Sequence, residues 1–182
     1  LHVRSRRQRQ MCIRDRSPRV LIETYRMFLT TNTEWKGLII GSGATKLLEQ
    51  LGLQAVDRLE FQERIDPDDV PALLDRVSIG FWSSRWEGQQ GTGAQALCCG
   101  CSVVSHDAPM MSCFRHYVSR DSGRLAERNA PERLAEALSL EVHAWEKGKR
   151  NPFNIAENWG SEFHAGEVAG RALAFLGLTP VS

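Results

Sequence analysis

Residues 78–105 constrain the fold of this chain most, because their order of residue types is that of one βαβ unit. A short apolar run leads to a polar turn, a small-residue helical pattern and a second run rich in β-branched residues. The turn carries one carboxylate, Glu87, and three glycines, Gly88, Gly91 and Gly93. Open α/β sheets bind ligands beyond the carboxyl ends of their strands, where this turn would lie. Glycines let backbone N–H groups close around an anion, and a helix adds its positive end, so we expect a phosphorylated ligand.

Alternating helix and strand patterns continue on both sides of this unit. The sequence predicts helices at 17–31, 44–51, 66–77, 110–118, 131–145 and 153–176. Further strands are predicted at 35–40, 58–65 and 123–126. Such alternation is typical of parallel sheets, because each crossover helix packs back onto the sheet between two parallel strands. We therefore expect an α/β fold with a Rossmann-like, doubly wound parallel sheet and helices on both faces.

Charge is distributed unevenly along the chain. The first 20 residues hold seven arginines and one aspartate, and the other residues hold 16 basic and 21 acidic side chains. A mildly acidic body offers no basic face to neutralise phosphates, which argues against nucleic acid as the main partner. An arm for RNA or anionic lipid is one interpretation of the arginine-rich start, and an incidental extension is the other.

The same start defines the expected domain boundary. We expect residues 1–16 to be a disordered or non-native Arg-rich extension and residues 17–182 to form one domain. No strand pattern precedes the helix predicted at 17–31, so we expect the chain to be part of a longer protein. Neither an apolar signal segment nor a run of roughly 18 apolar residues is present, so we expect a cytoplasmic protein without a membrane span.

Three of the five cysteines lie close together, at positions 98, 99 and 101. Structural zinc usually takes four ligands from two separated pairs, and neighbouring Cys98 and Cys99 would point different ways from a helix. We therefore expect no metal site and interpret these residues as small buried side chains at a helix end and a strand start. The odd number of cysteines also argues against a disulfide framework.

The order and spacing of several motifs resemble the donor-binding half of the retaining GT-B glycosyltransferases of the GT4 type, also called the glycosyl transferases group 1 family. The family signature is E-G-x6-E-A-L-A-C-G-x-P-V-V, and this chain has Glu87-Gly88, six residues, and then Q-A-L-C-C-G-C-S-V-V. Other family-like segments are L-I-E-T-Y, L-I-I-G-S-G, D-P-D-D-V-P-A-L-L and P-E-R-L-A-E-A-L. The likeness covers about residues 17–182.

The resemblance implies a nucleotide-diphosphate sugar bound between two Rossmann-like halves and a sugar transferred with retention, without a metal or other cofactor. It places Glu87 near the reacting end of the donor sugar, as the catalytic residue. The donor-binding residues that it implies are Gly88, Gln89, Gln90 and Gly91 at the pyrophosphate, Gln95 at the ribose, Gly41, Ser42 and Gly43 in a second glycine turn, and Arg64 and Ile65 beside the base.

This chain departs from the family pattern at several positions. Gln95 replaces the second glutamate and loses the charge that a carboxylate brings to two hydroxyls. A structural interpretation of Gln95 stays open beside the ribose contact, because Thr92 to Gln95 fits a T-x-x-Q capping box. Ser102 replaces the family proline, and Arg16 aligns with the lysine that helps to hold the phosphates.

Histidine and tryptophan give weaker signals. His106 follows a predicted strand, and as a lone histidine we expect it at the surface rather than in catalysis. We expect Trp82, Trp86, Trp145 and Trp159 to pack in the core, with a place in the sugar pocket as the alternative for Trp86.

Three functions remain from these patterns. The favoured one is the donor-binding half of a retaining glycosyltransferase that is inactive alone, with a glycan or lipid-linked sugar among the possible acceptors and the N-terminal half missing. The alternative is a non-catalytic GT-B domain with a structural or regulatory role, suggested by Gln95. A hydrolase or nucleotide-sugar epimerase is less favoured, since the chain shows no nucleophile elbow and no G-x-G-x-x-G fingerprint.

Overall fold

The strands form two parallel sheets. The computed structural model describes residues 17–41, 58–87 and 91–177. Strands β1 (Gly37–Ile40) and β2 (Leu59–Gln62) pair in parallel, and β3 (Ile79–Phe81), β4 (Ser102–His106) and β5 (Gly123–Ala126) form a second parallel sheet in that order. The predicted Rossmann-like parallel α/β fold is confirmed, but these strands form two sheets instead of one continuous ladder.

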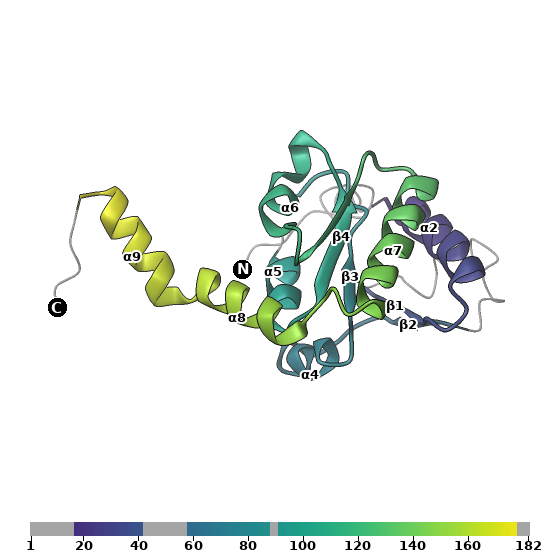
Figure 1. Cartoon of the computed structure of the whole chain (residues 1–182), viewed down its shortest axis with the longest axis horizontal. Coiled ribbons are helices and arrows are strands. Elements are labelled where there is room, and N and C mark those ends of the chain that lie inside the picture. The colour runs from purple at the N-terminus through teal and green to yellow at the C-terminus, as the bar shows by residue number, and fades with distance from the viewer. Residues whose placement is uncertain (1–16, 42–57, 88–90, 178–182) are drawn as a thin grey trace, which may run out of the picture.

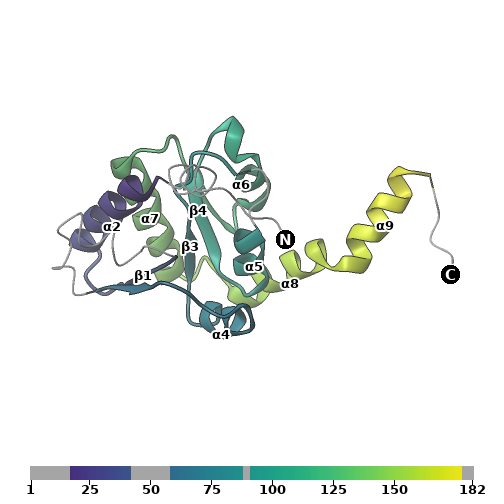
Figure 2. The same ribbon diagram turned by 180° about the vertical axis from the view of Figure 1, so that it is seen from behind.

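Helices cover both faces of the three-stranded sheet, as Figures 1 and 2 show. On one face lie α2 (Pro18–Thr31) and α7 (Pro131–Glu146), which pack against each other. On the other face lie α5 (Gly91–Cys98), α6 (Ser112–Tyr117) and α8 (Pro152–Phe163). The remaining helical elements are η1 (Pro67–Asp69), α4 (Val70–Leu74), η2 (Pro109–Met111) and α9 (Ala165–Phe175).

The two helical layers give the sheet one apolar core on each face. Neighbouring residues of a strand point to opposite faces, and in β4 the side chains of Val104 and Val103 enter different cores. Val104 packs in the core that α2 and α7 cover, and Val103 packs with residues of α5 and α6. Every residue of β4 is buried, so β4 is the central strand of its sheet. The core that contains Val104 also includes Ile39 of β1, which joins the two sheets.

A glycine ends α5 and turns the chain into β4. Gly100 has φ of 82°, in the left-handed region, and an added Cβ would lie 2.6 Å from the Pro152 carbonyl oxygen. The Cys101 N–H donates to the Ala96 oxygen at 2.9 Å and the Gly100 N–H to the Leu97 oxygen at 2.9 Å. These are the two hydrogen bonds of a Schellman motif, so the glycine satisfies the carbonyls at the helix end.

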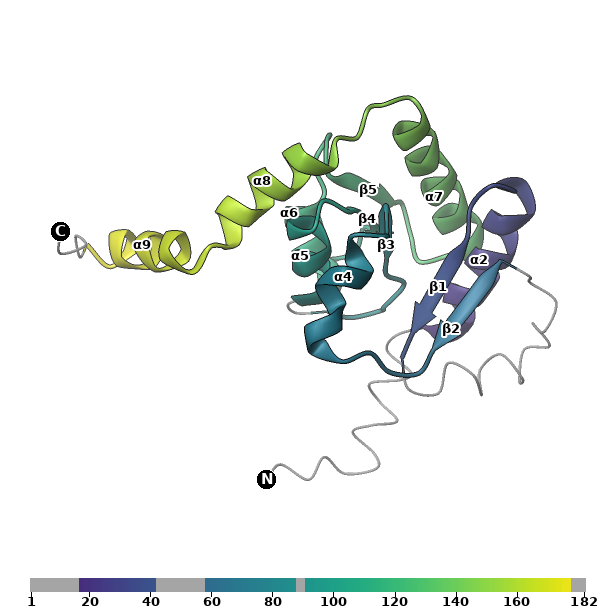
Figure 3. The same ribbon diagram turned by 90° about the horizontal axis from the view of Figure 1, so that it is seen from below.

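The helical region predicted from 153 to 176 consists of two helices, α8 and α9. His164 lies between α8 and α9 in an extended conformation, and its Nδ1 accepts a hydrogen bond from the Gly166 N–H at 3.2 Å. This contact caps α9, which explains why the helix restarts at Ala165. Helix α9 has no buried residue, and Figure 3 shows that it extends away from the sheets.

A buried ion pair fixes α7 to the segment before α8. Arg150 donates from Nε to Glu141 Oε1 at 2.6 Å and from Nη2 to Oε2 at 2.7 Å. Its Nη1 donates to the Arg120 carbonyl oxygen at 2.8 Å, next to the start of β5. The hydrogen bond to Glu141 is the main cause that raises the pKa of Arg150. Arg150 therefore holds α7 and the entry to β5 together.

We predict that Glu141→Ala lowers the free energy of unfolding by about 3–5 kcal/mol, because it leaves the Arg150 guanidinium buried without its carboxylate. Urea denaturation measures the change. Glu136→Ala is the matched control on the same helix, since the Glu136 ion pair with Arg133 is exposed and contributes at most about 1 kcal/mol. Equal effects of the two substitutions would contradict this account of the pair.

Candidate functional site

Polar residues gather where the strands of the larger sheet end. Ser83 and Ser84 follow β3 and are buried. Ser105 Oγ donates to the Trp82 carbonyl oxygen at 3.0 Å, and Asn129 Nδ2 donates to the Ser83 carbonyl oxygen at 2.9 Å. The loop after β3 is therefore tied to β4 and to the loop after β5. Parallel α/β sheets bind ligands at this carboxyl edge.

Glu87 lies at this edge and is held through its backbone. Its N–H donates to the Met110 carbonyl oxygen at 3.0 Å, and its own carbonyl oxygen lies 3.7 Å from Cys113 Sγ. Both partners belong to the segment that follows β4. Within the described ranges, no ion pair involves the half-buried Glu87 carboxylate.

Trp86 differs from its predicted place in the core. The side chain is 55% exposed, because the loop after β3 leaves the sheet before this residue. The other three tryptophans named from the sequence are partly buried and pack in the core that faces α5 and α8. The alternative interpretation of Trp86, a wall of the sugar pocket, stays a prediction.

The structure describes only part of the predicted glycine turns. Gly88, Gln89, Gln90, Ser42 and Gly43 lie outside the described residues. Gly91 is the first residue of α5, where the sequence places it in the turn. An added Cβ at Gly91 would meet nothing within 4 Å, so no close packing requires a glycine there.

Two other predicted positions follow the strands of the smaller sheet. Gly41 comes directly after β1, and its N–H donates to the Gln62 carbonyl oxygen at 3.0 Å. Arg64 and Ile65 follow β2, where Arg64 is exposed and Ile65 is half-buried. The Gln62 side chain donates from Nε2 to the Arg64 carbonyl oxygen at 3.1 Å. These residues therefore lie at the carboxyl ends of β1 and β2.

Gln95 is an exposed residue of α5. The helix begins at Gly91, so Thr92 lies inside it, and the capping box predicted from Thr92 and Gln95 is wrong. Thr92 Oγ1 instead accepts a hydrogen bond from Trp82 Nε1 at 3.3 Å. The contact of Gln95 with a ribose stays a prediction.

His106 is buried, where the sequence analysis expects a surface residue. It is the last residue of β4 and 3% exposed, because the loops after β3 and β5 cover the strand end. Burial lowers the pKa of His106 below its ordinary value of 6.5, and the neighbouring Asp107 opposes this shift. The imidazole is therefore neutral at neutral pH. His106 comes two residues after Val104, where the β-branched run ends, so the local sequence does not indicate its burial.

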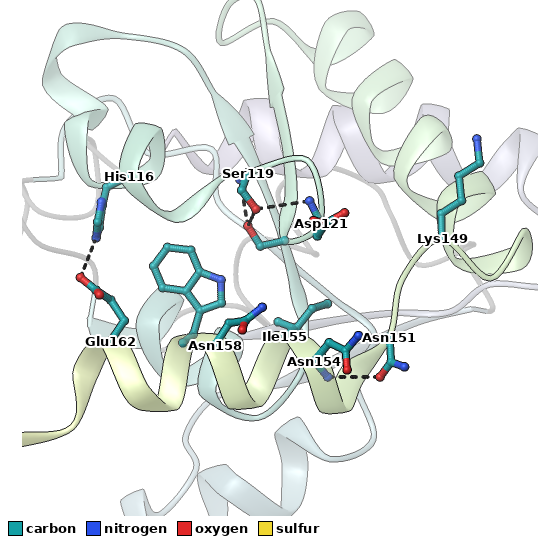
Figure 4. A pocket seen from close by; sticks show the side chains of 11 residues that line it. His116, Ser119, Asp121, Lys149, Asn151, Asn154, Ile155, Asn158 and Glu162 are labelled. Carbon is teal, nitrogen blue, oxygen red and sulfur yellow. Dashed lines mark hydrogen bonds and ion pairs between the residues drawn. The ribbon is translucent and has the colours of Figure 1, made fainter. Parts of the chain in front are cut away.

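A pocket of about 360 Å³ lies at the opposite edge, as Figure 4 shows. Ser119 and Ser122 come from the loop before β5, and Asn154 and Trp159 come from α8. Glu162 pairs with His116 at 3.7 Å on one side of this pocket. None of the predicted donor-binding residues that the structure describes lines it. The pocket is therefore separate from the carboxyl edge.

Of the three clustered cysteines expected to be buried, Cys101 is buried, and Cys98 and Cys99 are half-buried. Cys101 is fully buried, and its thiol donates to the Val77 carbonyl oxygen at 3.0 Å. Burial raises the pKa of Cys101 to about 12, which keeps the thiol protonated. In the parts of the chain that the structure describes, no group of three histidine, cysteine or acidic side chains could hold a metal. No helix of the same residues is long and apolar enough to cross a bilayer.

The chain matches a known protein family over most of its length. The family described as "Glycosyl transferases group 1" matches residues 11–140. The chain belongs to this family. The match begins within the segment predicted to be an extension and contains Glu87, Gln95 and the other predicted donor-binding positions. No curated protein sequence matches the chain.

Solved structures of GT-B glycosyltransferases share the fold of this group 1 member. Anabaena HepE in complex with UDP and glucose superimposes with a TM-score of 0.67 at 17% identity, over 90% of this chain and 45% of HepE. The C-terminal domain of the group 1 protein LpcC from Francisella tularensis gives 0.64 at 18% identity, over 80% of each chain. The catalytic domain of the cholesterol-α-glucosyltransferase from Helicobacter pylori gives 0.64 at 14%, over 81% of this chain and 91% of that domain. The chain therefore spans less than half the length of HepE.

The buried imidazole predicts a pH dependence of stability. The pKa of His106 is lower in the folded protein than the value of 6.5 in the unfolded chain, so the unfolded chain binds the proton first. The free energy of unfolding should therefore fall as the pH drops from 6.5 towards the folded value, by at most about 1.4 kcal/mol per pH unit. Urea denaturation between pH 7.5 and 5 measures this slope.

His106→Asn should remove that part of the slope, and His116→Asn, which changes an exposed histidine, should retain it. An unchanged slope in His106→Asn would show that another group causes the pH dependence.

Proposed function

We propose that this chain is the donor-binding half of a retaining GT-B glycosyltransferase of the GT4 type. It binds a nucleotide-diphosphate sugar at the carboxyl edge of its sheets. The acceptor binds an N-terminal half that lies beyond this chain, and a glycan or a lipid-linked sugar is a possible acceptor. The observation that carries the proposal is the position of Glu87, which precedes α5 by four residues in the sequence and whose N–H donates to the Met110 carbonyl oxygen after β4. The UDP and glucose in the HepE structure of the same fold support this assignment.

Glu87 and the start of α5 have complementary roles in this proposal. Transfer breaks the bond between the anomeric carbon and the diphosphate, so positive charge develops on the sugar and negative charge on the leaving oxygen. The Glu87 carboxylate holds the sugar and stabilises the positive charge. Backbone N–H groups at the α5 start, with the positive end of the helix, stabilise the departing diphosphate. These donors perform the function that a metal ion would have, so we expect no metal or other cofactor.

The proposal includes two further expectations. Residues 17–182 form the donor-binding domain, and residues 1–16 are an extension to it. A cytoplasmic location stays a prediction from the composition, and it agrees with a donor of the nucleotide-sugar class.

A second function, a non-catalytic GT-B domain with a structural or regulatory role, is favoured by one observation. Gln95 replaces a carboxylate of the family signature and lies exposed on α5, where it provides no charge. A domain of this kind would have no need for a free carboxylate at position 87. The behaviour of Glu87 therefore discriminates between the two functions.

Calorimetry with UDP-glucose, GDP-glucose and ADP-glucose tests the donor site. We expect one of them to bind weakly, and we expect Glu87→Ala to reduce its affinity about tenfold by removing a charged hydrogen bond to the sugar. The affinity for the matching nucleoside diphosphate should change little. Glu157→Ala, an exposed acid of α8 far along the chain, is the control. Failure of the folded wild-type chain to bind any of the three would contradict donor binding, and equal binding by Glu87→Ala would favour the non-catalytic domain.

We also predict that this chain alone transfers no sugar, because the acceptor contacts come from the other half of the enzyme. A coupled assay measures the rate at which nucleoside diphosphate is released from the donor. With this chain alone, that rate should not exceed the rate without protein. Turnover at rates of about 1 s⁻¹ or more, typical of enzymes, would show that this chain contains a complete active site.

A further inference from the structure

Three buried polar residues and the half-buried Asn129, from four segments, lie at the carboxyl edge. Ser17 precedes α2, Ser83 follows β3, His106 ends β4 and Asn129 follows β5. Asn129 Nδ2 donates to the Ser83 carbonyl oxygen at 2.9 Å and lies 3.5 Å from Ser17 Oγ. The Asn129 side chain therefore reaches from the loop after β5 to the loop after β3. We call these four residues the edge cluster.

His106 lies between the two loops that Asn129 connects. It pairs in register with Ala126 of β5 on one side. On the other side, Phe81 of β3 pairs in register with Val104 of β4. Ser83 comes two residues after Phe81, and His106 comes two residues after Val104. His106 shares a strand face with Val104, which packs in the core that α2 covers. The imidazole is therefore on the face of the sheet where α2 begins.

Two atoms of the edge cluster lack a hydrogen-bond partner. Asn129 Oδ1 and His106 Nδ1 are both buried and unpaired in the part of the chain that the structure describes. The orientation of the Asn129 amide follows from its contacts, since a carbonyl oxygen such as that of Ser83 can only accept. The NH2 group must face Ser83, and Oδ1 is the atom left open.

A buried donor or acceptor without a partner has lost its hydrogen bonds to water, which disfavours the folded state. The backbone of Ser17 adds to this cost, because its φ of 45° lies in the left-handed region that non-glycine residues rarely adopt. Costs of this kind are concentrated at ligand sites, where a bound group removes them. The start of the 14-residue helix α2 contributes the positive end of its dipole to the same place.

The hydrogen-bonding capacity of the two unpaired atoms indicates which chemical group of a ligand could bind them. Asn129 Oδ1 can only accept a hydrogen bond, so an ionised phosphate oxygen cannot satisfy it. His106 is neutral, and its Nδ1 can donate or accept according to tautomer. A hydroxyl group both donates and accepts, so it can donate to Asn129 Oδ1 and can pair with His106 Nδ1 in either tautomer. We propose that His106 and Asn129 bind a hydroxyl of the donor, on its sugar or on its ribose.

This inference rests on the proposed function and adds two residues to its site. Neither residue lies in the E-x7-E pair or in the glycine turns that the sequence indicates. Both are binding residues in the proposal, and the leaving diphosphate is bound elsewhere.

Calorimetry with matched ligands tests the edge cluster. The probes are UDP, GDP and ADP, each beside its glucose ester. His106→Leu should lower the affinity for the bound glucose ester by about tenfold, since one hydrogen bond to a hydroxyl is lost. His106→Asn should stay within about threefold of wild type, because its amide places a polar atom near the position of Nδ1. His116→Leu, at an exposed histidine of α6, is the matched control.

Comparing each nucleoside diphosphate with its glucose ester shows whether the hydroxyl belongs to the sugar or to the ribose. A sugar hydroxyl predicts that His106→Leu weakens only the glucose ester, and a ribose hydroxyl predicts that it weakens both members of the pair. A folded His106→Leu that binds both as tightly as wild type would overturn the inference and leave the proposed function intact. If wild type binds none of the six probes, the proposed function fails, and this inference fails with it.

A second measurement does not require His106→Leu to fold. In the wild-type chain, the ¹⁵N resonance of His106 Nδ1 should shift when the glucose ester saturates the protein, and that of His116 should not. Binding without a shift at His106 would also overturn the inference.

Discussion

Burial of β4 on both of its faces is the constraint on which the rest of the described structure depends. Val103 and Val104 are fully buried, and each packs in a different core. Removing both faces of a strand from water requires a helical layer on each side, and β3 and β5 must pair with its two edges. The carboxyl end of β4 then lies between the loops that follow β3 and β5. The candidate site follows from this packing, because its residues come from those loops.

Within the site, structural and binding roles are divided between backbone and side chain. Glu87 is held by its own N–H, so its carboxylate is not needed to form the loop. Asn129 uses its NH2 group to connect the loops and leaves its oxygen open. The Arg150 and Glu141 pair, at the other end of the sheet, satisfies its charges internally and is structural. Groups satisfied by the protein itself stabilise the fold, and groups left open are available to a ligand.

Local patterns predict the elements well and the site only in part. The strand at 123–126 and the helix at 17–31 agree with the structure to within a residue, because apolar periodicity and glycine positions are local signals. The burial of His106 and the exposure of Trp86 depend on how distant loops cover the strand ends, which no local pattern contains. The helix break at His164 depends on one side-chain contact within an otherwise helical pattern. Five of the predicted donor-binding residues lie outside the described ranges, so their roles stay predictions.

A crystal structure of this chain soaked with the sugar nucleotide that it binds tests the central claim most directly. The account predicts density for the ligand at the carboxyl edge, with the sugar beside Glu87 and the diphosphate at the start of α5. Density only in the pocket formed by Asn154 and Trp159 at the opposite edge, or none at the carboxyl edge, would contradict it.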